Sequence, residues 1–415
     1  MSEWREGTIA DVAAPSKNAL VGGPFGSNLV SRDYTPLGVP VIRGQNMGFG
    51  RWVSGEFVFV SKDKAEDLSA NIAKPGDLVF TQRGTLGQVA IVPAAPFDRY
   101  IISQSQMKLT VNPAKADTKF LFYFFTSEEQ QDYIRRNSIQ TGVPHTNLGH
   151  LRTTPLLLPP LSEQRAIASV LGVLDDKIEL NRRMNETLEA LAQSLFKSWF
   201  VDATQAALPR GWHESTIGQE VRVVGGSTPS TSKPEFWEGG TNHWATPKDL
   251  AALTSPVLLD TERKITNAGV QQISSGLLPS GTVLLSSRAP IGYLVIAEVP
   301  VAVNQGFIAM ICDGSLPNHY VRLWTKQNME AIEGRANGTT FMEISKSNFR
   351  PLPVVVPPQP LLDAFQKQVE PLHRRVVSNL HESRTLAALR DALLPKLLSG
   401  ELRLPAAAKL VEARS

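Results

Sequence analysis

One unit of sequence occurs twice in this chain, and this repetition constrains the fold more than any other feature. Residues 76–92, GDLVFTQRGTLGQVAIV, return as GTVLLSSRAPIGYLVIA at residues 281–297. Further along, PLLLPPLSEQ at residues 155–164 corresponds to PVVVPPQPLL at residues 353–362. The two halves of the chain are therefore expected to fold alike.

The spacing between matching residues gives the size of the repeated unit. Arg83 aligns with Arg288 at an offset of 288 − 83 = 205 residues, and Pro160 aligns with Pro358 at an offset of 358 − 160 = 198. Two offsets this close indicate one unit of about 200 residues, duplicated with small insertions. A duplicated unit favours a pseudo-two-fold molecule, which suits a target with two halves.

The composition is that of an ordinary soluble globular protein. The 415 residues suffice for two or three domains, with 42% hydrophobic and 20% charged residues. A net charge of +3 and a pI near 8.9 permit nucleic-acid binding without requiring it. The single cysteine, Cys312, excludes an internal disulfide and fits a reducing cytoplasm, where we expect the protein. No apolar run approaches about 18 residues, so no membrane segment is expected.

Each copy begins with a part rich in Gly, Pro, Thr and Val, over residues 1–160 and 204–358. Its apolar residues come in short runs bounded by turn signals, such as VPVIRG and GQVAIV, which predict short strands in a compact β-rich domain. Residues 118–137 and 318–335 are predicted helices at matching places.

Each copy ends with a long predicted helix. Residues 162–201 contain no proline, and their apolar residues recur in steps of three and four, with Ser162 as the expected N-cap. The matching segment follows Leu362. We expect Pro371 and Pro395 to kink or end parts of that helix and Gly400 to stop it.

Polar residues interrupt both apolar stripes at the same place. Asn181 and Asn185 occupy heptad positions in the first helix, and Asn379 and Ser383 occupy the matching positions in the second. If the helices pair antiparallel, these residues meet in a central polar layer that fixes register. Alternatively, they point to solvent.

Familiar signatures of catalysis are missing. The sequence has no GxxxxGK[ST] phosphate loop, no GxSxG elbow and no HExxH zinc helix, and its seven histidines lack metal-ligand spacing. An unfamiliar catalytic constellation stays possible, but the duplication favours binding. We expect no catalytic and no metal-ligating residue.

At the helices the chain resembles a known family. Residues 159–202, PPLSEQRAIASVLGVLDDKIELNRRMNETLEALAQSLFKSWFVD, resemble the central conserved region of the specificity subunits of type I restriction-modification systems. Residues 389–404, LRDALLPKLLSGELRL, resemble their distal conserved region. GGPFGSNL with GVPVIRGQNM, and the segment at residues 225–250, resemble the openings of two classes of their target-recognition domains. PPQPLLDAFQKQVEPL departs from a second PPLxEQ, so the distal docking surface is expected to be less regular.

The repeat and the resemblance together predict an α+β fold. Two β-rich target-recognition domains would lie in a pseudo-two-fold arrangement, separated by two long antiparallel helices that form a coiled-coil-like spacer. The expected boundaries are 1–160 for target-recognition domain 1, 161–203 for the central conserved helix, 204–358 for target-recognition domain 2, 359–403 for the distal conserved helix and 404–415 for a C-terminal tail.

The resemblance also implies a role and partners. Each domain would read one half of a split double-stranded DNA target, and the helices would set the gap. Two modification subunits, which bind S-adenosylmethionine and methylate adenine N6, would dock on the helices, and restriction subunits, which are motor-nucleases, would join for cleavage. This chain would be non-catalytic and would carry no cofactor, so S-adenosylmethionine, ATP and Mg²⁺ would belong to the partner subunits.

Candidate DNA contacts are polar side chains in loops beside glycines, because Arg matches guanine, Asn and Gln match adenine, and Lys, Arg and Thr suit phosphates. In the first domain they are Arg43, Gln45, Asn46, Arg83, Thr85, Gln104 and His145. In the second they are Lys233, His243, Lys248, Arg288, Asn304, Gln305 and Thr340. Arg83 and Arg288 occupy equivalent places, which favours phosphate contact.

Each candidate has a structural alternative. Arg83 and Arg288 could brace their own turns, Gln104 and Gln305 could order a loop, and His145 could be a plain surface histidine. The tryptophans Trp52, Trp237 and Trp244 are more typical of packing than of base stacking.

For the helices, the resemblance implies partner docking by Glu163, Gln164, Arg165, Asp175, Asp176 and Lys177. A solvated helix face is the alternative. Two other functions also stay open: a self-contained DNA methyltransferase or nuclease, and a coiled-coil adaptor that never meets DNA.

Overall fold

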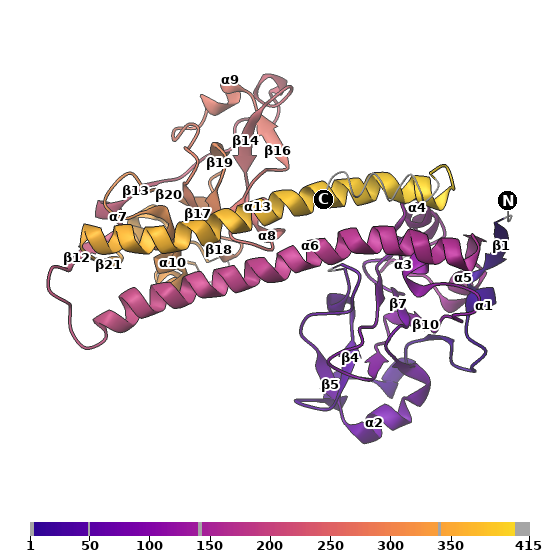
Figure 1. Cartoon of the computed structure of the whole chain (residues 1–415). Helices are drawn as coiled ribbons and strands as arrows, with labels where there is room; N and C mark the ends of the chain where they lie inside the picture. The colour runs from indigo at the N-terminus through magenta and orange to yellow at the C-terminus, as the bar shows by residue number, and fades with distance from the viewer. Residues whose placement is uncertain (1–3, 49, 140–142, 339–341, 403–415) are drawn as a thin grey trace. The chain divides into compact units, whose positions relative to one another are not determined.

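The computed structural model describes residues 4–48, 50–139, 143–338 and 342–402, and the chain forms two compact units (Figure 1). The first unit comprises residues 1–180 and 382–415, and the second comprises residues 181–381. Each unit thus contains one β-rich part and a portion of both long helices.

The first unit is built on short strands. They are β1 (Arg5–Thr8), β2 (Leu20–Gly22), β3 (Tyr34–Thr35), β4 (Val39–Ile42), β5 (Val58–Val60), β6 (Ile72–Ala73), β7 (Leu78–Thr81), β8 (Val89–Ile91), β9 (Tyr100–Ile102), β10 (Gln106–Leu109) and β11 (Pro155–Leu158). Its short helices are α1 (Ile9–Val12), α2 (Lys62–Asp67), α3 (Thr118–Thr126), α4 (Glu128–Arg136) and α5 (Leu148–Thr153), with 3-10 turns at Gly26–Asn28, Ser31–Asp33, Gly44–Asn46 and Ser69–Asn71.

The second unit repeats this order. Its strands are β12 (His213–Thr216), β13 (Arg222–Val224), β14 (Asn242–Ala245), β15 (Val257–Leu258), β16 (Arg263–Ile265), β17 (Val283–Ser287), β18 (Ile291–Ala297), β19 (Val301–Val303), β20 (Phe307–Ile311) and β21 (Pro353–Val356). Its short helices are α7 (Ile217–Glu220), α8 (Pro247–Ala251), α9 (Asn267–Val270), α10 (Asn318–Gln327), α11 (Met329–Glu333) and α12 (Lys346–Phe349), with helical turns at Lys197–Val201, Asp202–Thr204 and Pro234–Phe236.

The sheets confirm the duplication. In the first unit the strand order β2-β10-β7-β8 forms one sheet and β3-β5-β4-β9-β6 another; in the second, β13-β20-β17-β18-β15 and β16-β14-β19 take the same roles. Parallel pairs β4–β9 and β14–β19 correspond, as do the antiparallel pairs β1–β11 and β12–β21. The matching segments of the sequence therefore form matching strands.

Two helices are far longer than the others: α6 (Leu161–Phe196) and α13 (Gln359–Leu398) (Figure 1). Within the first unit, buried apolar residues of both helices, such as Leu171 and Leu393, pack in one core with Phe120 of α3 and Leu78 of β7. The helix pair and α3 therefore cover one face of the sheet, as an amphipathic helix must.

The two helices run antiparallel within each unit, as predicted. In the first unit Arg390 contacts Asp175 at 2.7 Å and Glu382 contacts Lys177 at 3.3 Å, so positions rise along one helix as they fall along the other. In the second unit the ring of Phe196 lies 6.1 Å from that of Phe365, while Asn185, earlier in α6, contacts Asn379, later in α13.

Asn181, Asn185 and Asn379 form a buried polar layer in the second unit. Each is at most 4% exposed. Asn379 Nδ2 donates to Asn185 Oδ1 at 2.8 Å, and Asn181 Nδ2 donates to the Asn379 carbonyl at 3.4 Å. The polar layer is confirmed for these three residues and the solvent alternative is wrong, while Ser383 is half-buried in the first unit.

The expected helix ends need two corrections. The amide of Gln164 donates to the carbonyl of Pro160 at 3.0 Å, so α6 begins before Ser162, which is not its N-cap. Neither Pro371 nor Pro395 ends α13. A helix proline costs about 3 kcal/mol, whereas each large apolar side chain contributes about 1.5–3 kcal/mol when fully buried, and both prolines are exposed between buried neighbours. Gly400, with φ +73°, follows the helix end as predicted.

Candidate nucleic-acid interface

The turns that carry Arg83 and Arg288 are built alike. Each follows a fully buried strand, β7 or β17, and each is held by a neighbouring segment through backbone hydrogen bonds. In the first unit the amide of Thr146 donates to Gln82 at 3.0 Å, and in the second the amide of Ile344 donates to Ser287 at 3.0 Å. The predicted equivalence of the two arginines is confirmed.

The arginines differ in their side-chain surroundings. Arg288 Nη1 lies 3.6 Å from Oε2 of Glu343, and the two side chains are 38% and 46% exposed. An exposed pair of this kind contributes about 0–1 kcal/mol. Arg83 is exposed, and among the described residues its guanidinium has no carboxylate partner. Neither arginine donates to a carbonyl of its own turn in the described part of the chain, so the proposed bracing is not seen.

Gln104 and Gln305 each hold a loop of their own unit, which is the alternative to DNA contact given for them above. Gln104 Nε2 donates to the carbonyl of Leu29 at 2.8 Å and to that of Gly26, so both amide hydrogens hold the loop after β2. Gln305 Oε1 accepts from Thr228 Oγ1 at 2.8 Å in the matching loop of the second unit. Asn304 Oδ1 accepts from the amide of Gly306 at 2.8 Å, which shapes the same turn.

These two opening loops lie directly on the sheets. A Cβ at Gly23 would come 1.9 Å from the Ser103 carbonyl oxygen, and one at Gly226 would come 1.7 Å from that of Val303. Only glycine permits such backbone contact. Both openings noted in the sequence therefore begin at a backbone anchor.

The loop after β4 holds Arg43, Gln45 and Asn46, and here one expectation is corrected. Asn46 is 0% exposed. Its Oδ1 accepts from the Arg43 amide at 3.0 Å, and its Nδ2 donates to Ser54 and Glu56 carbonyls at 3.1 and 2.8 Å. Asn46 therefore shapes the loop and is withdrawn as a DNA contact. Gln45 is exposed, with a weak 3.4 Å bond to the Glu56 carbonyl.

In the second unit the remaining candidates are mostly engaged with their own chain. Lys248 Nζ lies 2.8 Å from Glu262 and Lys233 Nζ lies 5.3 Å from the ring of Phe236. His243 Nδ1 lies 3.2 Å from Asp260, and its burial, with Lys264 nearby, lowers its pKa despite that carboxylate. Thr340 lies outside the described residues.

Two candidates of the first unit remain. Thr85 is exposed and His145 is half-buried.

The tryptophans are packing residues, as predicted. The ring of Trp244 is buried and meets that of Trp237 edge to face at 5.0 Å. Arg263 lies 3.6 Å over Trp237, and Arg51 lies 5.0 Å over Trp52.

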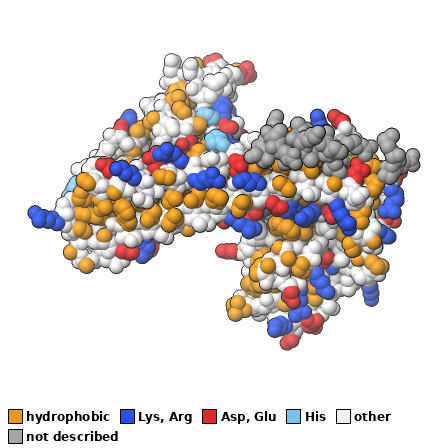
Figure 2. Space-filling view, viewed as in Figure 1, with side chains coloured by type: hydrophobic (Ala, Val, Ile, Leu, Met, Phe, Trp, Pro, Cys, Tyr) orange, Lys and Arg blue, Asp and Glu red, His pale blue; other side chains and the backbone are white. Residues whose placement is uncertain are grey.

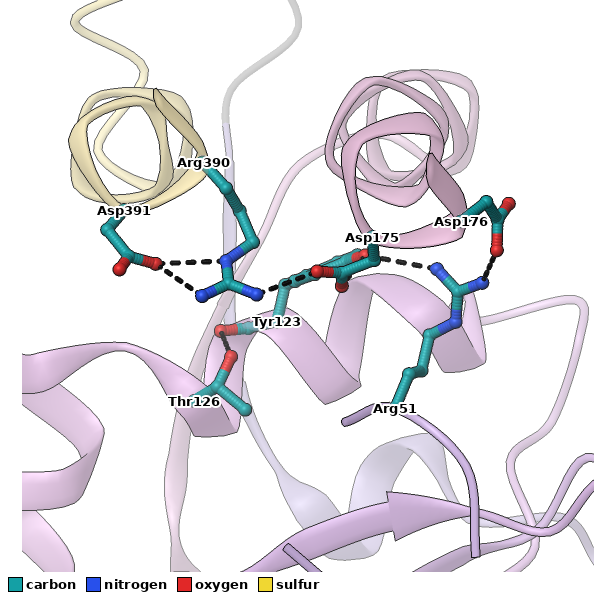
Figure 3. A network of polar contacts seen from close by, with 7 residues as sticks. All are labelled: Arg51, Tyr123, Thr126, Asp175, Asp176, Arg390 and Asp391. Atoms are coloured by element: carbon teal, nitrogen blue, oxygen red, sulfur yellow. Dashed lines mark hydrogen bonds and ion pairs between the residues drawn. The ribbon is translucent and has the colours of Figure 1, made fainter. Parts of the chain in front are cut away.

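A polar network in the first unit engages Asp175 and Asp176 of α6, two of the predicted docking residues, with other parts of the chain (Figure 3). Tyr123 of α3 donates to Asp175 Oδ2 at 2.6 Å, and Arg390 of α13 donates to Asp175 Oδ1 at 2.7 Å. Arg51 donates to the Tyr123 hydroxyl at 3.1 Å and pairs with Asp176. The network joins the loop carrying Arg51 to both helices.

The pKa of Tyr123 rises above its usual value, first because the ring is buried and then because the Asp175 carboxylate is close. The phenol therefore keeps its proton and acts as a hydrogen-bond donor. Arg51, Tyr123 and Arg390 were missed in the sequence because their partners are 125, 52 and 215 residues away.

Gln164 serves the fold of its own chain. It is 1% exposed, its Nε2 donates to the Pro159 carbonyl at 2.8 Å, and its Oε1 accepts from the Asp117 amide at 2.9 Å. It is withdrawn as a docking residue because a partner could not reach it. Arg165 and Asp176 are exposed, and Glu163 and Lys177 are partly exposed.

The long helices also expose apolar side chains. Val173 and Leu180 in the first unit and Leu191 in the second are about half exposed, all on α6. Figure 2 shows hydrophobic side chains gathered along the long helices of the second unit. Exposed apolar stripes on a helix indicate contact with another protein.

Among the residues that the structure describes, no helix combines the length and apolarity needed to cross a bilayer. Likewise, the described part of the chain holds no group of three or more His, Cys, Asp or Glu arranged to bind a metal ion.

Comparison with known proteins identifies the family. The Type I restriction enzyme HindI specificity subunit of Haemophilus influenzae is 24% identical over 479 residues, covering 97% of this chain and 100% of that protein. The MjaIX specificity subunit of Methanocaldococcus jannaschii is 25% identical over 380 residues, covering 84% of each. The crystal structure of a type I restriction-modification S subunit from M. genitalium has the same fold, with a TM-score of 0.58, 18% identity and coverage of 95% and 96%. The family model described as "Type I restriction modification DNA specificity domain" matches residues 1–190 and 209–370, so this chain belongs to that family.

Proposed function

We propose that this chain is the DNA-recognition subunit of a type I restriction-modification complex. Each β-rich part would read one half of a split double-stranded target, and α6 with α13 would set the gap between the halves. The family supports DNA recognition, and the duplicated strand order supports two reading heads. We retain the boundaries 1–160, 161–203, 204–358, 359–403 and 404–415 as functional divisions of this proposal.

The observation that carries the proposal is the matched pair of arginine turns. Arg83 and Arg288 follow equivalent buried strands and are exposed or partly exposed beside loops of the same construction. Arginine binds both phosphates and the guanine edge, so each unit offers a cation on a rigid support. Two such supports in one chain suit a target with two halves.

The remaining chemistry is assigned to partners. Two modification subunits would dock on α6 and α13, where exposed Val173, Leu180 and Leu191 and the charged residues Glu163 and Arg165 support a protein contact. Restriction subunits would join the same complex. S-adenosylmethionine, ATP and Mg²⁺ would be bound by these subunits, and the whole complex would act on DNA in the cytoplasm.

Mapping the methylated adenines in the source genome tests the proposal. A motif of two specified halves around a fixed unspecified gap is expected. Binding of the chain with its modification subunits to a duplex of that motif should weaken steeply with salt, because counterions are released from phosphates. A continuous motif with no gap would contradict the split reading.

The two other functions are separated by simple assays. Transfer of a labelled methyl group to DNA by the purified chain alone would indicate a self-contained enzyme. Failure to bind any duplex at low salt, even with the modification subunits present, would indicate an adaptor that does not meet DNA.

A further inference from the structure

The turns that carry Arg83 and Arg288 make the same backbone hydrogen bonds to matching segments, so the side chains at matching positions can be compared directly. Ile139 and His145 exchange amide-to-carbonyl hydrogen bonds at 2.9 and 3.1 Å, and Asn337 and Glu343 do so at 2.9 Å each. His145 bridges Arg83, and Glu343 bridges Arg288. His145 and Glu343 therefore occupy the same position in the two units.

The charge at this shared position is different. In the second unit Glu343 places a carboxylate 3.6 Å from Arg288, with both side chains open to solvent. In the first unit the half-buried His145 turns its Nδ1 to the carbonyl of Val143, at 3.1 Å. The described residues around Arg83 supply no carboxylate to pair with its guanidinium.

A carboxylate on a DNA-reading surface restricts what that surface can bind. Phosphate oxygens repel it, and of the major-groove edges only the amino groups of cytosine and adenine can donate to it. An arginine beside it finds two acceptors on guanine, O6 and N7. An adjacent Arg and Glu thus match the guanine and cytosine of one base pair, and the carboxylate disfavours phosphate contact by its neighbour.

We propose that Glu343 is a specificity-determining residue, which together with Arg288 reads a G·C base pair, whereas Arg83 at the equivalent place grips a phosphate. This inference rests on the proposed function and assigns different roles to two arginines that the repeat makes equivalent. The exposed ion pair is weak, so its members are free to turn to base edges.

The test uses the full chain assembled with its modification subunits. Duplexes are selected from a pool with randomised bases, and the bound sequences give the preferred base at each position. E343Q is the main variant, because glutamine keeps the shape but removes the charge. R288K is the second, because lysine keeps the charge but loses the fork that contacts guanine at two points. H145Q and R83K are the matched variants of the first unit.

E343Q and R288K should both weaken the preference at one and the same position, in one half-site, by roughly 5- to 150-fold. E343Q should also steepen the salt dependence for nonspecific duplex by about one phosphate contact, as Arg288 becomes available to the backbone. H145Q should change neither property. R83K should leave every base preference unchanged, and R83Q should reduce the salt dependence by about one contact.

The outcomes separate this inference from the proposed function. A wild-type complex that selects no split motif would overturn both. A split motif whose base preferences are the same for wild type, E343Q and R288K would overturn the reading role alone. Equal melting temperatures for wild type and variants show that a changed preference arises at the interface, and an H145Q variant that alters base preference as strongly as E343Q would also overturn the assignment.

Discussion

Tyr123 donates its phenolic proton to Asp175 over 2.6 Å, which ties helix α3 to helix α6 in the first unit. The hydroxyl also accepts from Arg51, and the same carboxylate accepts from Arg390. The Tyr123 hydroxyl and the Asp175 carboxylate thus link the loop that carries Arg51 to both long helices.

Replacing Tyr123 with Phe should lower the free energy of unfolding of the first unit by about 1.5–3 kcal/mol, because a buried hydrogen bond to a charged group is lost. Urea unfolding, followed by intrinsic fluorescence, measures the change. Tyr133→Phe is the control, since among the described residues the Tyr133 hydroxyl makes no hydrogen bond, and it should shift stability by no more than about 0.5 kcal/mol. Equal losses in both variants would contradict the special role of Tyr123.

Acidification should destabilise the second unit through His319. Burial, then His373 and Arg322, lower the pKa of His319 to about 3. The unfolded chain binds the proton near pH 6.5, so the folded state keeps its full stability above that pH and loses it as the pH falls toward 3. The expected slope is about 1.4 kcal/mol per pH unit.

Unfolding in urea at a series of pH values checks this slope. Glu298, which lies 2.7 Å from His373, and Glu189, which binds Arg322, face the same cluster and are kept unchanged. His319→Gln should flatten the profile between pH 6 and about 4, whereas His213→Gln, at an exposed position, should leave it as in the wild type. A slope that persists in the first variant points to another group.

Asn181→Leu should raise stability by about 1 kcal/mol while loosening the register of the helices, since buried polar groups in such seams are costly but specifying. Melting temperature gives the first quantity. The spread of distances between spin labels on cysteines placed at Glu186 and Ser378 gives the second. Burial raises the pKa of the native Cys312 thiol to about 12, so labelling selects the introduced cysteines. Lower stability with an unchanged spread would count against the register role.

Insertion of one helical turn beside Asn185, with a matching turn beside Asn379, should lengthen the unspecified gap of the target and leave both half-sites unchanged. The reason is that an added turn extends a helix by about 5.4 Å. Sequencing the methylated sites of cells that carry the altered subunit measures the gap. An unchanged gap with altered half-sites would refute the helices as a spacer.

The repeat in the sequence was enough to predict what depends on local pattern. It placed Arg83 and Arg288 at equivalent turns, and heptad spacing placed Asn181 and Asn379 in one layer. These predictions succeeded because strand and helix periods decide which residues share a face.

What depended on distant partners could not be predicted. Asn46 and Gln164 are polar residues in regions that look exposed, yet carbonyls and amides of other segments complete their burial. From its local sequence Asp175 also looks like part of a solvated helix face. Its partners, Tyr123 and Arg390, come from distant parts of the chain. The presence of Pro371 predicted a break in the helix. The helix continues because Val369 and Val376 on either side are buried, and that burial cannot be predicted from the local sequence.

The contact of Gly23 and Gly226 with the carbonyls beneath them bears on how such a protein changes over generations. Main-chain atoms make the close approach at each glycine, so substitutions elsewhere in the loop leave that contact in place. The loop sequence beyond each glycine can therefore vary while the sheet beneath it keeps its backbone contact.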